Sequence, residues 1–158
     1  MSPLSTHLSK RDDLTRIHEM EAFTIRLERL IALGEDETPE GEQLREQMEA
    51  IWWQCPSQIQ KRMEGLAIDL ASLFAPCSAP TGQGIQDGAS GVPARVEMAI
   101  TTAAWDDALR YLRGRSTYAP HQVARLRSTA YDALGFHQAA ALFAEQARQL
   151  EGQLTVTA

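Results

Sequence analysis

Two stretches of the C-terminal half place aromatic, small and large apolar residues in the same order, and this pattern constrains the fold more than any other feature of the sequence. Trp105–Leu112 and Phe136–Phe143 each begin with an aromatic residue, place an alanine three positions later and end in two large apolar residues. The stretches lie 31 residues apart. Small and bulky residues at this spacing are typical of a helix face that packs closely on another helix. The recurrence predicts a helical repeat, an architecture that usually holds partners.

Apolar residues elsewhere in the chain also recur at steps of three and four. The clearest stripe runs from Leu14 to Ile31, and further stripes run from Leu44 to Trp52 and from Ile59 to Phe74. This period is that of an amphipathic helix, and we find no alternating run of the kind a strand needs. We therefore predict an all-α fold of antiparallel helical hairpins or a bundle.

Local signals predict where several of these helices begin and end. Gly34 and Gly135 follow the last apolar residue of a stripe, as helix-terminating glycines do. Thr38 before Pro39 is typical of an N-cap followed by a proline in the first turn. Pro56 disfavours helix in the residue before it and so separates the second helix from the third.

A change of composition divides the chain into two helical parts. Residues 76–94 are rich in proline and glycine and poor in large apolar residues, which predicts a linker or long loop. The predicted segments are a flexible N-terminus (1–11), three helices (12–75), the linker (76–94), four helices (95–151) and a frayed tail (152–158).

Composition and charge exclude several classes of protein. Hydrophobic residues make up 44% of the 158, which is enough for a sizeable core. The net charge of −6 falls entirely on residues 1–75, and an acidic surface repels a phosphate backbone. No apolar run approaches the ~20 residues that span a bilayer, and the N-terminus lacks the apolar stretch of a signal peptide. We expect a cytoplasmic protein that neither binds nucleic acid nor inserts into a membrane.

The sequence offers no catalytic motif, metal site or cofactor site. Cys55 and Cys77 form no CxxC pair and have no nearby histidine, so reduced thiols are favoured over a disulfide or a zinc site. His18 with Glu21 would supply two metal ligands, but a bundle metal site needs several such pairs. Nucleophile elbows and phosphate-binding loops are missing.

The C-terminal half resembles the tetratricopeptide-repeat family, which stacks pairs of antiparallel helices. Trp105 and Ala108 match its aromatic and small positions at the start of a second helix, and Pro120 falls where the family often closes a repeat. The stretch from Tyr131 through Gly135 to Ala139 resembles the following helix end, turn and second-helix start.

This resemblance covers about residues 94–151, which is two repeats at most, and the 31-residue recurrence is shorter than the family period of about 34. Because such stacks usually need three repeats, it implies that the N-terminal helices cap the stack or that the chain dimerises. An ordinary helical hairpin bundle is the alternative.

Five arginines form the first candidate binding surface. Residues 110–127 contain no Asp or Glu, and their arginines are Arg110, Arg113, Arg115, Arg125 and Arg127. If the helices that carry them are antiparallel neighbours, several guanidinium groups would face one way and suit a carboxylate-rich peptide or a phosphate. The alternative is a solvated face whose charge is offset by acids elsewhere in the fold.

Trp53 is the second candidate. Adjacent helical residues point about 100° apart, so Trp52 continues the apolar stripe and Trp53 lies at its edge. There it would either pack at the margin of the core or meet a partner, and tryptophan is enriched at binding hot spots.

The sequence favours a non-catalytic interaction or adaptor module that binds an acidic segment of a partner protein. The first alternative is a structural protein that self-associates into a homo-oligomer through its amphipathic N-terminal helices. The second, from a different class, is a small helical enzyme whose site the sequence does not reveal.

Overall fold

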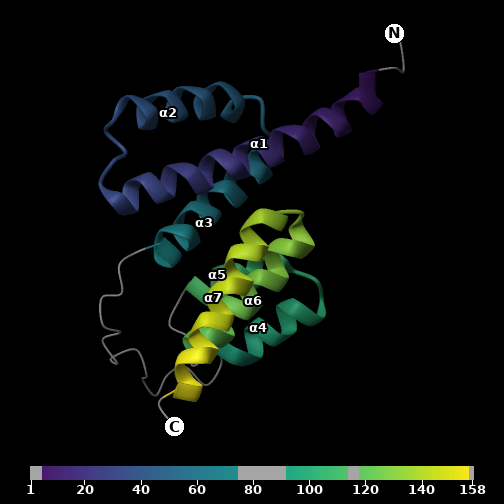
Figure 1. Cartoon of the computed structure of the whole chain (residues 1–158). Helices are drawn as coiled ribbons and strands as arrows, with labels where there is room; N and C mark the ends of the chain where they lie inside the picture. The colour runs from purple at the N-terminus through teal and green to yellow at the C-terminus, as the bar shows by residue number, and fades with distance from the viewer. Residues whose placement is uncertain (1–4, 75–91, 114–117, 157–158) are drawn as a thin grey trace. The chain divides into compact units, whose positions relative to one another are not determined.

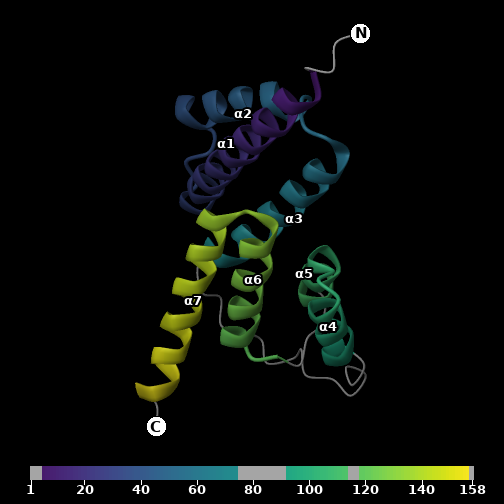
Figure 2. The same cartoon turned by 90° about the vertical axis from the view of Figure 1, so that its right-hand side faces the viewer.

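The computed structural model describes residues 5–74, 92–113 and 118–156, and these residues form seven helices and no strand (Figures 1 and 2). The all-α prediction is therefore confirmed. The chain divides into two compact units, Met1–Phe74 and Ala75–Ala158. The helices of the N-terminal unit are α1 (Ser5–Leu33), α2 (Pro39–Trp52) and α3 (Ser57–Phe74). Those of the C-terminal unit are α4 (Val92–Thr101), α5 (Trp105–Arg113), α6 (Pro120–Leu134) and α7 (His137–Val156).

The long helix α1 is central to the N-terminal unit because both α2 and α3 pack on it. Its Met20 and Ile25 are buried together with Leu44 of α2 and with Leu66 and Leu70 of α3. We predicted that consecutive helices would be neighbours, but α3 packs on α1 rather than back along α2. The reason is that α2 has a single apolar stripe, which α1 already covers.

The turn between α1 and α2 follows the predicted signals. Gly34 ends α1 in the left-handed conformation (φ 71°), and Thr38 caps α2 by accepting a hydrogen bond from the amide of Gly41 at 3.4 Å. Arg45 of α2 donates to the carbonyl of Asp36 at 3.0 Å and to its carboxylate at 2.8 Å. A Cβ atom at position 41 would lie 2.0 Å from that carbonyl oxygen, so only glycine fits there.

Three polar side chains lie inside the N-terminal unit. Glu21 and Thr24 of α1 and Asp69 of α3 are buried. Thr24 donates to the carbonyl of Met20 at 2.6 Å, one turn earlier in the same helix. Burying a carboxylate is costly unless it is paired or hydrogen-bonded, so the core of this unit does not consist of apolar side chains alone.

The C-terminal unit consists of two hairpins, α4–α5 and α6–α7, with α5 packed on α6. The recurring motif lies where it was predicted to lie. Its alanines, Ala108 and Ala139, are fully buried, and so are Leu112 and Phe143 further along the same helices. These two helices therefore bury the same face of the motif.

Two turns of this unit share one hydrogen-bond pattern but differ in the residue that carries it. The amide of Gly135 bonds to Asp132 at 3.1 Å and the next amide bonds to Tyr131 at 2.8 Å, which is a Schellman helix end. After α4, the amide of Ala103 bonds to Ile100 at 3.1 Å, and the next residue completes the same pattern. Ala103 has φ 58°, a left-handed conformation that glycine normally supplies.

Three predicted boundaries were wrong. Helix α1 starts at Ser5 and not near residue 12, because residues 5–11 contain no glycine or proline to delay it. Helix α4 includes 92–94, the end of the predicted linker, since proline is tolerated in a first turn. Helix α7 runs through Gly152 to Val156, because one helical glycine costs only about 1 kcal/mol. The rest of the linker, with Cys77, lies outside the described residues.

Candidate functional site

Alanine is frequent among the buried residues of α6 and α7, which pack on each other. The buried alanines of these helices are Ala124, Ala130, Ala139, Ala140 and Ala147. Small side chains allow two helix backbones to approach closely, and here the hydroxyl of Ser128 on α6 donates to the backbone carbonyl of Ala140 on α7 at 2.7 Å. This bond fixes the register of one helix against the other.

An aromatic cluster also joins α6 and α7 in the core of this unit. The ring of Tyr131 stacks on Phe143 with centroids 5.4 Å apart and meets Phe136 edge-on at 6.1 Å. Two of the predicted arginines contact this cluster. Arg113 donates to the Tyr131 hydroxyl at 3.3 Å, and the guanidinium of Arg127 lies over the Phe143 ring at 6.0 Å. Arg113 and Arg127 are both half-buried, so they contribute to the packing of the unit.

The remaining predicted arginines lie in different surroundings. Arg110 is exposed on α5, where it pairs with Asp107 one turn earlier at 2.9 Å and lies over the Tyr111 ring at 5.4 Å. Arg125 is exposed on α6 and pairs with Glu151 of α7. Arg115 lies outside the described residues. The two exposed members of the predicted set, Arg110 and Arg125, thus meet carboxylates from their own helix or the next, as in the solvated-face alternative.

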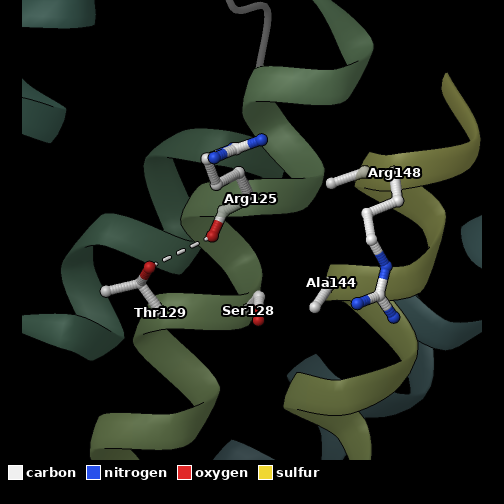
Figure 3. Close-up of a pocket in the computed structure, with 6 residues that line it drawn as sticks. Arg125, Ser128, Thr129, Ala144 and Arg148 are labelled. Carbon is white, nitrogen blue, oxygen red and sulfur yellow. Dashed lines mark hydrogen bonds between the residues drawn. The ribbon is translucent and has the colours of Figure 1, made fainter. Parts of the chain in front are cut away.

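A shallow groove of about 190 Å³ lies between α6 and α7, and it brings together two arginines that are distant in sequence (Figure 3). Its lining consists of Arg125, Ser128, Thr129, Ala144, Ala147 and Arg148. The Arg125 and Arg148 side chains are 63% and 70% exposed. We call this the α6–α7 groove. Its lining combines two exposed positive charges with two alanines and two hydroxyl groups, and both hydroxyls donate to backbone carbonyls.

Each groove arginine is held by a glutamate of α7. Arg125 pairs with Glu151 across the two helices. Arg148 pairs with Glu145, three residues earlier, and its Nε donates to that carboxylate at 3.1 Å. The hydroxyl of Thr129 donates to the carbonyl of Arg125 at 3.2 Å (Figure 3). The groove is therefore positively charged at two points, but both charges are partly neutralised by the protein itself.

Sequence reasoning missed Arg148. It selected a segment free of acids, and Arg148 lies between two glutamates. Ala144, Ala147 and Arg148 do share a helix face by their spacing, which is a signal that was available. Their position opposite Arg125 depends on the register of two helices, which the sequence pattern does not contain.

Trp53 does not pack in the core. It is the residue after the last turn of α2, and 75% of its surface is exposed. The preceding residue, Trp52, is half-buried. The two rings therefore differ in exposure, as expected for adjacent helical residues that point in different directions. The expectation of core or core-margin packing is wrong because α3 leaves α2 at this point to pack on α1.

A second hollow of about 150 Å³ lies between α4 and α5. Its lining includes Met98, Ala99 and Tyr111, with one charge of each sign from Arg95 and Asp107. Nearby, burial and then the carboxylate of Glu97 raise the pKa of Tyr118 above its ordinary value of 10.0. This hollow has no net charge and gives no preference for an acidic ligand.

The His18 and Glu21 pair does not form a site in this structure. Glu21 is buried and His18 is exposed, so the two side chains lie in different environments on α1. Within the described ranges, no three His, Cys, Asp or Glu side chains gather as metal ligands would. None of the described helices has the length and apolar character needed to cross a bilayer.

Comparisons with protein-family models, with curated proteins and with solved structures give no match to this chain.

Proposed function

We propose that this chain is a non-catalytic interaction module whose C-terminal unit binds an acidic segment of a partner protein. The observation that carries the proposal is the α6–α7 groove, where Arg125 and Arg148 present exposed guanidinium groups. Guanidinium groups bind carboxylates through paired N–H donors. The resemblance to tetratricopeptide repeats supports the same proposal, since helix pairs of that kind usually hold peptides.

The geometry narrows the set of arginines that we propose for binding. Arg113 and Arg127 contact the aromatic cluster, so replacing them would disturb folding and binding together. Arg125 and Arg148 are exposed on the rim of the groove, and their replacement should leave the core intact. They are therefore the residues to test.

The test measures binding of a fluorescein-labelled oligoglutamate peptide by anisotropy, with oligoglutamine as the neutral control. The double variant Arg125→Glu, Arg148→Glu should weaken binding by about tenfold or more, because two attractive charges become repulsive. Raising the salt concentration should weaken wild-type binding as well.

Two arginines serve as matched controls because they pair with acids in the same way but lie outside the groove. Arg26 pairs with Glu40 across two helices at 2.9 Å, as Arg125 does with Glu151. Arg110 pairs with Asp107 three residues earlier, as Arg148 does with Glu145. The variant Arg26→Glu, Arg110→Glu should bind almost as well as wild type. Equal losses in both double variants would show that binding follows net charge and would refute the groove.

Self-assembly is the second candidate function, and the exposed apolar residues of the N-terminal unit favour it. Of the seven large apolar side chains that are exposed in the described residues, five belong to α1–α3 or to the end of α2: Leu14, Ile31, Leu33, Trp53 and Ile68. Where such side chains lie side by side they form apolar patches of the kind that meet another protein. Light scattering that shows a strict monomer at high concentration would exclude this candidate.

A further inference from the structure

We infer that Glu151 acts as an internal ligand of Arg125 at the α6–α7 groove and that an incoming carboxylate binds Arg125 by displacing it. This inference rests on the proposed function, because it describes how an acidic segment would gain access to the groove. The pair joins two helices: Arg125 belongs to α6 and Glu151 to the last turns of α7.

The chemistry of the existing contacts identifies the ligand class. Both groove arginines already bind carboxylates, Arg125 that of Glu151 and Arg148 that of Glu145. The two glutamates lie outside the groove lining, whereas both arginines belong to it. The arginines therefore present carboxylate-binding donors at the groove, and glutamate or aspartate side chains of a peptide suit these donors best.

The pair is weak enough to exchange. The Arg125 side chain is 63% exposed and that of Glu151 is 36% exposed. Exposed ion pairs contribute little to stability, since water screens them and two long side chains must be held in place. A peptide carboxylate that replaces Glu151 therefore has little to overcome, and Glu151 returns to water at the edge of the helix.

Glu151 also orients the guanidinium of Arg125 before the ligand arrives. A preordered side chain loses less conformational freedom on binding. Removing the competing carboxylate would raise the affinity for a ligand, whereas losing the preordering of Arg125 would lower it. The exposure of the ion pair indicates which of the two effects is larger. Because Arg125 is held by one exposed contact rather than by packing, the loss of competition should outweigh the loss of order.

The experiment replaces the internal carboxylate by its neutral analogue. Glu151→Gln keeps the length and a hydrogen-bonding oxygen but removes the charge. Affinity for the oligoglutamate probe should rise about twofold to fivefold, the range expected when a competing surface ion pair is removed. In the Arg125→Glu background the same substitution should give a much smaller change, because the competition is then absent.

Two substitutions that remove one negative charge elsewhere provide the control. Asp107→Asn leaves Arg110 without its carboxylate partner on the same unit, and Glu40→Gln does the same for Arg26. If either raises affinity as much as Glu151→Gln does, the gain reflects net charge and the inference is wrong. Circular dichroism of Glu151→Gln should match wild type, which confirms that α7 is intact.

The outcomes separate the inference from the function on which it rests. If neither wild type nor Glu151→Gln binds oligoglutamate, the proposed function fails. If wild type binds, and the Arg125→Glu, Arg148→Glu variant does not, but Glu151→Gln leaves the affinity unchanged or lower, only the internal-ligand inference fails. Tighter binding of a phosphoserine peptide than of oligoglutamate in the same assay would overturn the carboxylate assignment.

Discussion

The cores of the two units consist of different kinds of side chain. The N-terminal unit buries aliphatic and methionine side chains around α1, includes the carboxylates of Glu21 and Asp69, and leaves Trp53 exposed. The C-terminal unit packs alanine-rich helix faces against a cluster of three aromatic rings, which centres on Tyr131 and Phe143. The contrast shows that one helical period is compatible with two kinds of core, one that includes buried carboxylates and one that combines small side chains with aromatic rings.

The difference also separates the two candidate functions. Large apolar side chains that remain outside the core belong mainly to the described part of the N-terminal unit, where they would favour association with another chain. The α6–α7 groove of the C-terminal unit has exposed charge and two alanines in its lining. An acidic peptide and a second copy of the chain would therefore be recognised by different units.

The largest effect that we expect concerns the aromatic cluster. Phe143→Ala should reduce the free energy of unfolding by about 3–5 kcal/mol, because it leaves a cavity and removes the stacking on Tyr131. The corresponding substitution in the N-terminal unit is Leu66→Ala, which also removes a fully buried side chain. It should reduce the free energy of unfolding by about 2–4 kcal/mol.

Urea unfolding followed by circular dichroism measures both losses. Hydrogen exchange of the amides in α6 and α7, and in α1 and α3, assigns each loss to its unit. A smaller loss for Phe143→Ala than for Leu66→Ala would contradict the expectation that the larger cavity and the lost stacking on Tyr131 make the aromatic substitution the costlier one.

The next effect concerns two helical glycines that differ in their surroundings. Gly41→Ala places a methyl group 2.0 Å from the carbonyl oxygen of Asp36, so the turn must move and the Arg45 contacts are strained. We expect a loss of about 1–3 kcal/mol. Gly152→Ala meets nothing within 4 Å and should stabilise α7 by about 0.5–1 kcal/mol. Thermal unfolding of the two variants should shift in opposite directions, and a shift in the same direction would refute the close approach at Gly41.

The turns show how much of the fold local chemistry predicts. Gly34, Thr38 and Gly135 act through their own backbone or side chain, so their roles were predictable and are confirmed. The packing of α3 on α1 was not predictable, because it depends on which helix face remains uncovered after α2 has packed.

The same distinction applies to the candidate site. Arg125 was found because arginines gather between residues 110 and 127, but that gathering is not a surface: Arg113 and Arg127 contact aromatic rings instead. Arg148 was missed because it joins Arg125 only through the register of α6 against α7, which the bond from Ser128 to Ala140 helps to fix. The spacing of residues in the sequence indicates which side chains share a face of one helix. The groove also depends on how two helices are aligned, which that spacing does not indicate.

A smaller effect on the free energy of unfolding is expected at three helix ends, which have the same hydrogen bonds but differ in the residue at the left-handed position. Ala103 is left-handed at φ 58°, whereas Gly34 and Gly135 supply this conformation without steric cost. Ala103→Gly should therefore raise the free energy of unfolding by about 1 kcal/mol, and Gly135→Ala should lower it by a similar amount. Urea unfolding measures both. If Ala103→Gly were destabilising, the loss of side-chain contacts at position 103 would outweigh the strain.

The smallest effect is a pH dependence within the N-terminal unit. Burial raises the pKa of Glu28 above its ordinary value of 4.5. A carboxyl group whose pKa is raised on folding favours the folded state while it is protonated, and this contribution is lost as the pH rises through the folded-state pKa. At neutral pH the ionised Glu28 therefore opposes folding, by less than about 1 kcal/mol once solvent screening of this half-buried group is allowed for.

Glu28→Gln carries no charge at any pH, so it should be more stable than wild type at pH 7, and the difference should vanish below about pH 4, where Glu28 is protonated in both states. Urea unfolding of both proteins at several pH values measures this difference, and Glu19→Gln, at an exposed position of the same helix, controls for the loss of a charge. An equal gain at pH 7 and at pH 4 would show that the glutamine stabilises α1 by packing, and that the N-terminal unit tolerates this carboxylate without an electrostatic cost.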